Sequence, residues 1–227
     1  MKKTLCLIID SVPHVAWQET YETHRRIWNK CLDLRPEVEG YFLYSDPSLP
    51  VEHSTEHRRF TVRGEERLDT IFDKTIQALQ VLLNKHHYVI RTNVSSLWDF
   101  ELLQQLKLPR ENLYTGHVIP WQPPFVTGSG MVLSRDAAEK LSTATSKGVD
   151  PHDDIAIAQA LYARGVHATH RPWLWFDYAR DVEQFTVGQY LHYRLKDTTW
   201  DPERRCERKV TEAVFAKVYP NAAVVKS

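Results

Sequence analysis

The stretch from Tyr88 to Ser96 constrains the fold of this chain most. It begins with a short apolar run, Tyr88-Val89-Ile90. A mostly polar run that starts with an arginine follows directly, Arg91-Thr92-Asn93-Val94-Ser95-Ser96. A run of this length with β-branched residues is typical of a buried strand. Ligands of open α/β sheets bind beyond the carboxyl ends of strands. The pattern predicts a buried strand followed by a ligand site, with an ordinary turn before a helix near Ser96 as the alternative.

Strands and helices alternate through the first half of the chain. Thr4–Ile9 and Gly40–Tyr44 have the apolar content of buried strands, and an aspartate follows each within two residues. Trp17–Leu34 and Arg67–Asn84 carry apolar residues at helical spacing. This alternation predicts a sheet with helices packed against it.

The second half continues the pattern less regularly. Strands are expected at Tyr114–Val118 and Met131–Leu133. Ser134 has the character of an N-cap for a helix over Asp136–Ser142, and a second, alanine-rich helix is expected over Ile155–Arg164. His53–Arg59 is charged and is expected to be exposed. Val166–Tyr178 is expected to form a strand and an aromatic wall. The basic residues of Tyr190–Lys196 are expected to form either a solvated face or a phosphate site.

Composition excludes several classes of protein. The chain has 227 residues, 42% of them hydrophobic, and a formal net charge of zero, which favours one domain with a real core and does not suggest a nucleic-acid binder. Cys6, Cys31 and Cys206 are far apart and odd in number, which indicates free thiols in a reducing compartment. The apolar run after Lys2 and Lys3 is too short for a signal peptide, and no later stretch is long enough to span a membrane. We therefore expect a soluble, cytoplasmic protein.

Five motifs occur in an order that resembles one enzyme family. They are Arg25-Arg26-Ile27-Trp28, Ile71-Phe72-Asp73-Lys74-Thr75 with Glu66 upstream, Arg91-Thr92-Asn93-Val94, Gly128-Ser129-Gly130-Met131-Val132-Leu133-Ser134-Arg135-Asp136, and Asp153-Asp154-Ile155. Together they resemble the GT-A fold nucleotide-sugar glycosyltransferases, nearest to the β-1,3-galactosyltransferase and Fringe group, over residues 4 to 178. The resemblance implies a GT-A type α/β fold, a mixed and mostly parallel sheet flanked by helices. It also implies a single domain of residues 1–227, with a nucleotide-binding half near 1–108 and an acceptor and catalytic half near 109–227.

The resemblance implies an activity as well. Enzymes of this group move a sugar from a nucleotide-sugar donor, here with UDP-sugars favoured, to a hydroxyl of a glycan or glycoprotein acceptor. An inverting transfer needs a carboxylate that takes the proton from the attacking hydroxyl. Asp154 stands where the family has this base, and Asp153 is the second choice. Without a membrane anchor, a bacterial or large-virus glycan-building enzyme fits better than a resident Golgi enzyme.

The same resemblance assigns the other site residues by position. Those expected to bind the donor nucleotide and its phosphates are Asp10, Ser11, Arg25, Lys74, Arg91, Thr92, Asn93, Ser95, His192, Arg194 and Lys196. Those expected to contact the acceptor or the sugar rings are Trp121, Gly128, Ser129, Gly130 and Trp173. Glycine lets the backbone approach a ligand closely. Tryptophan can stack on a sugar ring, although core packing is its commoner role.

One departure from the family concerns the metal ion. The family binds a divalent ion through Asp-x-Asp, whereas Thr92-Asn93-Val94 offers no carboxylate. Hard divalent ions need oxygen ligands, preferably charged ones. No metal is therefore predicted as a firm cofactor, and basic side chains such as Arg194 and Lys196 are expected to balance the diphosphate charge. The alternative is Mn²⁺ or Mg²⁺ recruited by the donor diphosphate, with Asn93 and His170 as weak ligands.

Two other functions are consistent with the sequence. A catalytically inactive sugar-nucleotide or carbohydrate-binding module would explain the missing Asp-x-Asp and the many aromatic residues. A nucleotidyltransferase that makes nucleotide sugars would share a similar sheet, but it needs a glycine-rich loop after the first strand, and Asp10–Trp17 contains no glycine. Helix capping also gives a complete explanation for carboxylates at Asp153 and Asp154.

Overall fold

The computed structural model describes residues 2–10, 17–145, 150–176, 182–195 and 205–222. The chain divides into two compact units that interleave along the sequence. Unit 1 comprises Met1–Val12, Glu37–Asn93 and Lys107–Arg171, and unit 2 comprises Pro13–Pro36, Val94–Leu106 and Pro172–Ser227. Each unit has its own sheet and its own helices.

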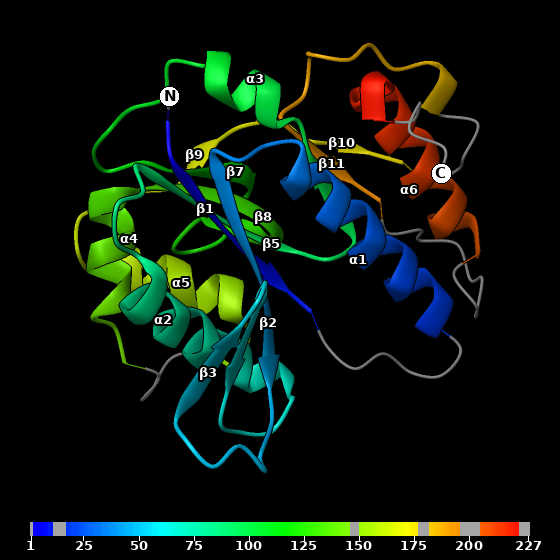
Figure 1. Cartoon of the computed structure of the whole chain (residues 1–227). Coiled ribbons are helices and arrows are strands. Elements are labelled where there is room, and N and C mark those ends of the chain that lie inside the picture. The colour runs from blue at the N-terminus through cyan, green and yellow to red at the C-terminus, as the bar shows by residue number, and fades with distance from the viewer. Residues whose placement is uncertain (1, 11–16, 146–149, 177–181, 196–204, 223–227) are drawn as a thin grey trace. The chain divides into compact units, whose positions relative to one another are not determined.

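Unit 1 is built on a sheet of eight strands within the described residues (Figure 1). The strands are β1 (Thr4–Ile9), β2 (Val38–Ser45), β3 (His53–Glu56), β4 (Arg59–Val62), β5 (Tyr88–Asn93), β7 (Tyr114–Ile119), β8 (Phe125–Ser134) and β9 (Thr169–His170). Their order in space is β3-β4-β2-β1-β5-β8-β7-β9. β4, β2, β1 and β5 run parallel, whereas β8 is antiparallel to both β5 and β7. The predicted mixed, mostly parallel sheet flanked by helices is confirmed.

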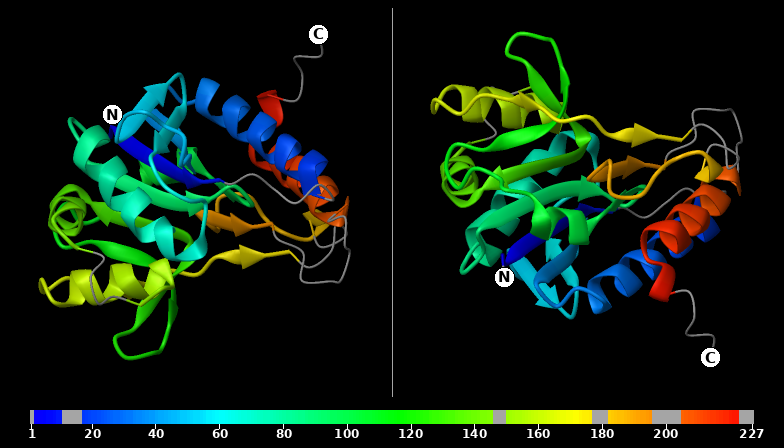
Figure 2. Two further views of the ribbon diagram at one scale, coloured as in Figure 1. Left: turned by 90° about the horizontal axis from the view of Figure 1, so that it is seen from below. Right: turned by 90° about the horizontal axis from the view of Figure 1, so that it is seen from above.

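Three helices of unit 1 contact one another and pack on one face of this sheet (Figure 1, Figure 2). They are α2 (Ile71–Leu82), preceded by the short 3-10 helix η2 (Leu68–Thr70), α4 (Arg135–Ser142) and α5 (Asp153–Tyr162). Side chains alternate between the two faces along a strand. Alternate residues such as Leu5 and Leu7 of β1 therefore belong to this helical layer and are fully buried. Burial of such side chains contributes roughly 1.5–3 kcal/mol each.

The strand order reverses between β1 and β5. From β1 the chain returns to the sheet as β2 on one side, and from β5 it returns as β7 and β8 on the other side. In open α/β sheets such a switch point, at the carboxyl ends of the strands, marks the edge that binds ligands. Asp10 directly follows β1, and Asn93 is the last residue of β5. The polar residues singled out in the sequence therefore flank the switch point of this sheet.

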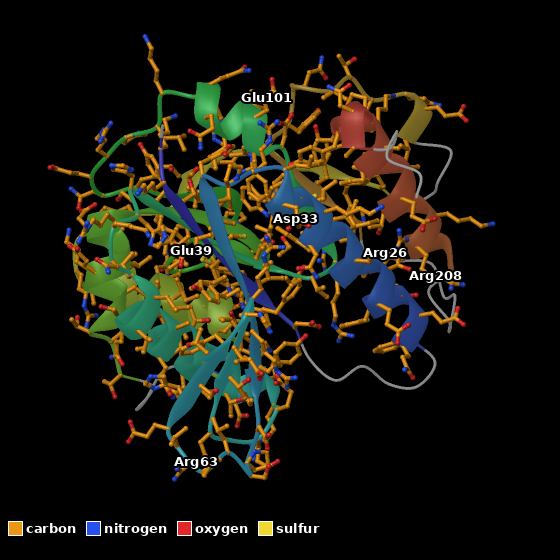
Figure 3. All side chains as sticks on the ribbon, in the orientation of Figure 1. Arg26, Asp33, Glu39, Arg63, Glu101 and Arg208 are labelled. Carbon is orange, nitrogen blue, oxygen red and sulfur yellow. The ribbon has the colours of Figure 1, made fainter. Side chains whose placement is uncertain are left out.

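Unit 2 contains a sheet of three short strands within the described residues. They are β6 (Ser96–Trp98), β10 (Leu174–Trp175) and β11 (His192–Arg194), in the order β10-β11-β6. The helices are α1 (Gln18–Asp33), α3 (Phe100–Gln105) and α6 (Arg205–Val218), followed by the 3-10 helix η4 (Pro220–Ala222). α1 and α6 lie side by side (Figure 1, Figure 2). Ion pairs join them at the surface, Arg26 with Glu212 at 2.7 Å and Arg208 with Glu19, and the two arginines are labelled in Figure 3.

His24 of α1 is fully buried against α6. Its Nε2 lies 2.8 Å from Oε1 of Glu207, and its Nδ1 lies 3.2 Å from Oγ1 of Thr211. Thr211 donates its only hydroxyl hydrogen to the carbonyl oxygen of Glu207, at 2.7 Å. Its Oγ1 therefore accepts from Nδ1, and both ring nitrogens face acceptors.

Several predicted elements differ from those observed. His53–Arg59 is exposed as predicted, but its first four residues form β3, which pairs with β4. β6 was not expected, and β8 extends through Gly128–Gly130, where its register with β7 shifts. Ser134 does precede α4, but its hydroxyl donates to Asp136 instead of accepting from a helix N–H. Among the described residues, no helix has the length and apolar character required to cross a bilayer.

Candidate functional site

Charged side chains gather where the helical layer of unit 1 ends, at the switch point. In β5, Val89 belongs to the apolar layer, and Arg91, two residues later on the same face, is only 2% exposed. Lys74, in the first turns of α2, and Asp153, at the start of α5, are buried as well. The charges of Arg91 and Asp10 both act on Lys74. Charged residues are rarely buried without a partner or a function.

Arg91 is bound at two of its nitrogens. Nη2 donates to Oδ2 of Asp153, and Nη1 donates to the carbonyl oxygen of Gly128. The third nitrogen, Nε, is buried and has no partner among the described residues. The N–H of Gly128 donates to Oδ2 of Asp154, at 3.0 Å. Gly128 thus links the two side chains: its carbonyl oxygen accepts from Arg91, and its amide donates to Asp154.

Asp153 and Asp154 differ in their surroundings, although they are adjacent. Burial raises the pKa of Asp153, and the neighbouring Asp154 charge raises it further, while Arg91 opposes both effects. Asp154 is only partly buried, and its other oxygen, Oδ1, accepts from the N–H of Ile155 at 3.0 Å. Neither carboxylate therefore serves as a simple helix cap alone, because each also binds groups of β5 or β8.

Lys74 is held by Glu66. Its ammonium lies 2.6 Å from Oε1 of Glu66, whose other oxygen accepts from the N–H of Ser45 at 2.8 Å. Burial lowers the pKa of Lys74, and Glu66 opposes that effect. The carboxylates of this region, Asp10, Glu66, Asp153 and Asp154, outnumber its cations, Lys74 and Arg91. The cluster is acidic when all of these groups are ionised.

Asp10 is 1% exposed and accepts a hydrogen bond from the hydroxyl of Tyr44. Tyr44 stands near the end of β2, and the guanidinium of Arg59 lies 4.3 Å from its ring centroid. The sequence interpretation did not assign Tyr44 to the site. Register could have found it, because Ile9 pairs with Leu43, so the residues that follow them, Asp10 and Tyr44, are neighbours.

The remaining unit 1 residues of the predicted site differ in burial and in their hydrogen-bond partners. Thr92 donates to the carbonyl oxygen of Ser129 at 2.7 Å, and Thr92 pairs with Gly130 in the sheet. Trp121 is 62% exposed in the segment between β7 and β8. Nδ1 of His170 accepts from the N–H of Val118 at 3.2 Å.

Unit 2 holds a second group of predicted residues, around Arg194. Nη1 of Arg194 donates to the hydroxyl and carbonyl oxygens of Ser95, at 2.8 and 3.3 Å, and lies 3.5 Å from the hydroxyl oxygen of Ser96. Arg194 is 9% exposed, so the stretch around it is a buried strand and not a solvated face. Arg25, also in unit 2, lies 5.8 Å from the ring centroid of Tyr21. Ser11 and Lys196 lie outside the described residues.

Aromatic rings form a row on one face of the unit 2 sheet. His192 stacks on Trp98 at 4.7 Å between ring centroids, Trp173 lies 5.5 Å from His192, and Trp175 lies 5.4 Å from Trp173. The register places Ser96, Trp98, His192 and Arg194 on the same face, because Ser96 pairs with Arg194 and Trp98 with His192. Trp175 is 41% exposed, at the open end of the row.

No family model matches this chain, and no curated protein matches it either. The case for a function therefore depends on the residues and their geometry.

Proposed function

We propose that this chain is a GT-A type glycosyltransferase that moves a sugar from a nucleotide-sugar donor to a hydroxyl of a glycan acceptor, with inversion. A UDP-sugar is the favoured donor. The observation that carries the proposal is the pair Asp153 and Asp154 at the start of α5, joined through Gly128 to Arg91 at the switch point of the sheet. Such an edge is where α/β proteins bind nucleotides.

The proposed reaction assigns one chemical role to each group. The acceptor hydroxyl gives its proton to Asp154 while its oxygen forms a bond to the anomeric carbon of the donor sugar. The bond from that carbon to the diphosphate oxygen breaks, and UDP leaves with the electron pair. Asp154 suits the role of base better than Asp153, because it is partly exposed and is not ion-paired with Arg91.

Donor-dependent release of UDP tests this function. The protein is incubated with a panel of UDP-sugars and a mixed glycan acceptor, and Asp154→Asn is compared with the unmodified chain. We expect turnover to fall by about two to four orders of magnitude, the usual loss for a general base. Asp136→Asn is the matched control, because Asp136 is also a first-turn carboxylate, in α4, away from the cluster. Normal turnover of Asp154→Asn would show that Asp154 is not the base. If millimolar UDP does not raise the melting temperature, the donor is not a UDP-sugar.

A second candidate is a catalytically inactive sugar-nucleotide or carbohydrate-binding module. This candidate is favoured because the cations predicted to bind phosphate already have partners within the protein. Glu66 binds Lys74, Asp153 binds Arg91, and Ser95 binds Arg194. A neutral sugar needs no such cations, and an aromatic row such as that of unit 2 suits its apolar faces. Sugar binding without UDP release, for every donor of the panel, would select this candidate.

A further inference from the structure

We propose that Arg91 is a positioning residue for the base Asp154, acting through Gly128, and not a ligand of the donor phosphates. This inference rests on the proposed function for its catalytic part and on geometry for its structural part. Arg91 binds the Gly128 carbonyl, and the Gly128 amide binds Asp154. A shift of Arg91 therefore moves the peptide groups on which the Asp154 carboxylate depends.

The surroundings of Arg91 leave little room for a phosphate. Its side chain is 3% exposed, and the Asp153 carboxylate, whose side chain is 10% exposed, already supplies an anionic partner. An incoming phosphate would have to displace a buried carboxylate, which would then be left without its counter-charge. Arg91 thus resembles a structural arginine, with its charge matched inside the protein.

Gly128 has no side chain, which lets Arg91 and Asp154 approach its backbone closely. A β-carbon added to it would lie 3.0 Å from Nη1 of Arg91, 3.5 Å from Oδ2 of Asp154 and 3.6 Å from Oδ1 of Asp153. All three groups therefore converge on one residue of β8 that has no side chain. Close approach of side chains to a backbone is a recognised use of glycine.

Asp153 has a separate part in this arrangement. Asp153 is the counter-ion of the buried Arg91 guanidinium. Among the hydrogen bonds of the described residues, its side chain binds no group of β8. Arg91 can hold its two partners at once because the guanidinium presents donors in a rigid fork. A lysine has a single ammonium and cannot reproduce that geometry.

Three measurements on Arg91→Lys and Arg91→Met test the proposal, with Arg135→Lys as the control for loss of an arginine in an exposed ion pair of unit 1. Hydrogen exchange of the Gly128 amide reports its bond to Asp154 without any need for activity. We expect exchange to be at least about tenfold faster in both Arg91 variants, with the overall fold preserved by circular dichroism. UDP affinity should stay within about twofold, and turnover should fall by about a hundredfold with donor KM unchanged.

The opposite pattern would overturn the inference. Retained protection of the Gly128 amide, together with UDP affinity weakened by about tenfold or more, would make Arg91 a phosphate ligand. If Arg91→Met does not fold, Arg91→Lys, which keeps the charge beside Asp153, decides the question by the same measurements. If the unmodified chain neither binds UDP nor transfers sugar, the proposed function fails, while the Gly128 exchange rates still decide whether Arg91 holds this contact.

Discussion

The amide of Gly128 donates to Oδ2 of Asp154 across 3.0 Å and joins a central strand to the start of α5. Gly128 and Asp154 are 26 residues apart in sequence, and no local rule links them. The bond has a chemical consequence, because it fixes one oxygen of the carboxylate that we propose as the base. The geometry of this carboxylate therefore depends on the position of β8.

Gly128→Ala should disturb this carboxylate more than it disturbs the fold. The added methyl group would lie 3.0 Å from Nη1 of Arg91, which must shift by a few tenths of an ångström, and 3.5 Å from Oδ2 of Asp154, an ordinary contact. The shift of Arg91 would reach Asp154 through the Gly128 backbone. A displacement near 1 Å can cost about a hundredfold in rate. We expect the transfer rate to fall by about 10- to 100-fold, with the urea midpoint changed little. Unchanged transfer would show that Asp154 tolerates the shift or is not the base.

Gly116→Ala should instead destabilise unit 1. A β-carbon there would lie 2.4 Å from Cγ1 of Val126 and 2.6 Å from the carbonyl oxygen of Gly130, so strand backbone would have to move. Overpacking of this kind costs about 3 kcal/mol or more when the backbone cannot yield. Gly165→Ala is the comparison, because φ is +75° there but the space is open, and its strain should cost only about 1–2 kcal/mol. Equal losses in urea unfolding would contradict this ranking.

The sequence predicts those strands and helices whose apolar periods are strong. β1, β5, α1 and α2 each carry a continuous apolar face, and observed and predicted bounds differ by only a few residues. β6 was missed because its three residues are too short to show an alternation. β3 was missed because its residues are polar and exposed, so strand pairing with β4 decides their conformation.

The site residues were predicted by type and position, but their partners were not. The sequence marks Arg91 and Lys74 as basic residues near a ligand site, yet an acidic side chain binds each of them: Glu66 binds Lys74 from eight residues away, and Asp153 binds Arg91. The pair Arg91–Asp153 spans 62 residues. Such long-range pairing is set by sheet order, which a single sequence does not reveal. Tyr44 was missed because its contact with Asp10 depends on the pairing of β1 with β2.

His86 should make unit 1 less stable as the pH falls. It is 2% exposed, with Nε2 3.1 Å from Oε2 of Glu39, and burial lowers its pKa despite that partner. Below the ordinary value of 6.5, the unfolded chain therefore binds more protons at this residue than the folded chain does. Stability is then lost as the pH falls through 6.5 toward the lowered folded pKa.

Melting temperatures between about pH 7.5 and 5.5 would measure this effect. We expect His86→Gln to show a smaller loss across that window than the unmodified chain, since glutamine keeps a donor for Glu39 but does not titrate. His53→Gln, at an exposed histidine of unit 1, should leave the loss unchanged. An identical pH dependence in His86→Gln and the unmodified chain would rule out His86 as the source.

Glu207→Gln should weaken the packing of α6 on α1. The substitution removes the negative partner of His24 in a contact where both side chains are 0% exposed. A buried hydrogen bond to a charged group typically contributes about 1.5–3 kcal/mol. Glu212→Gln is the matched control, because Glu212 pairs with Arg26 on the same two helices but is 54% exposed, and its loss should be about 0–1 kcal/mol. Similar urea midpoints for the two variants would show that the His24 contact contributes no more than a surface pair.

Removal of divalent ions separates the two proposed ways of balancing the donor diphosphate. Thr92-Asn93-Val94 supplies no carboxylate, and Nδ1 of His170 is occupied by a backbone N–H. A tightly held Mn²⁺ or Mg²⁺ needs charged oxygen ligands, so we expect transfer to survive excess EDTA. Arg194, which the resemblance assigns to the phosphates, donates from Nη1 to the hydroxyl oxygen of Ser95 at 2.8 Å. Arg194→Ala should raise the donor KM by about tenfold or more.

The same assay has a clear contrary result. If EDTA abolishes transfer and Mn²⁺ restores it, an ion is required and basic side chains alone do not balance the diphosphate. Such an ion would then be held chiefly by the oxygens of the donor diphosphate, as in the alternative drawn from the sequence.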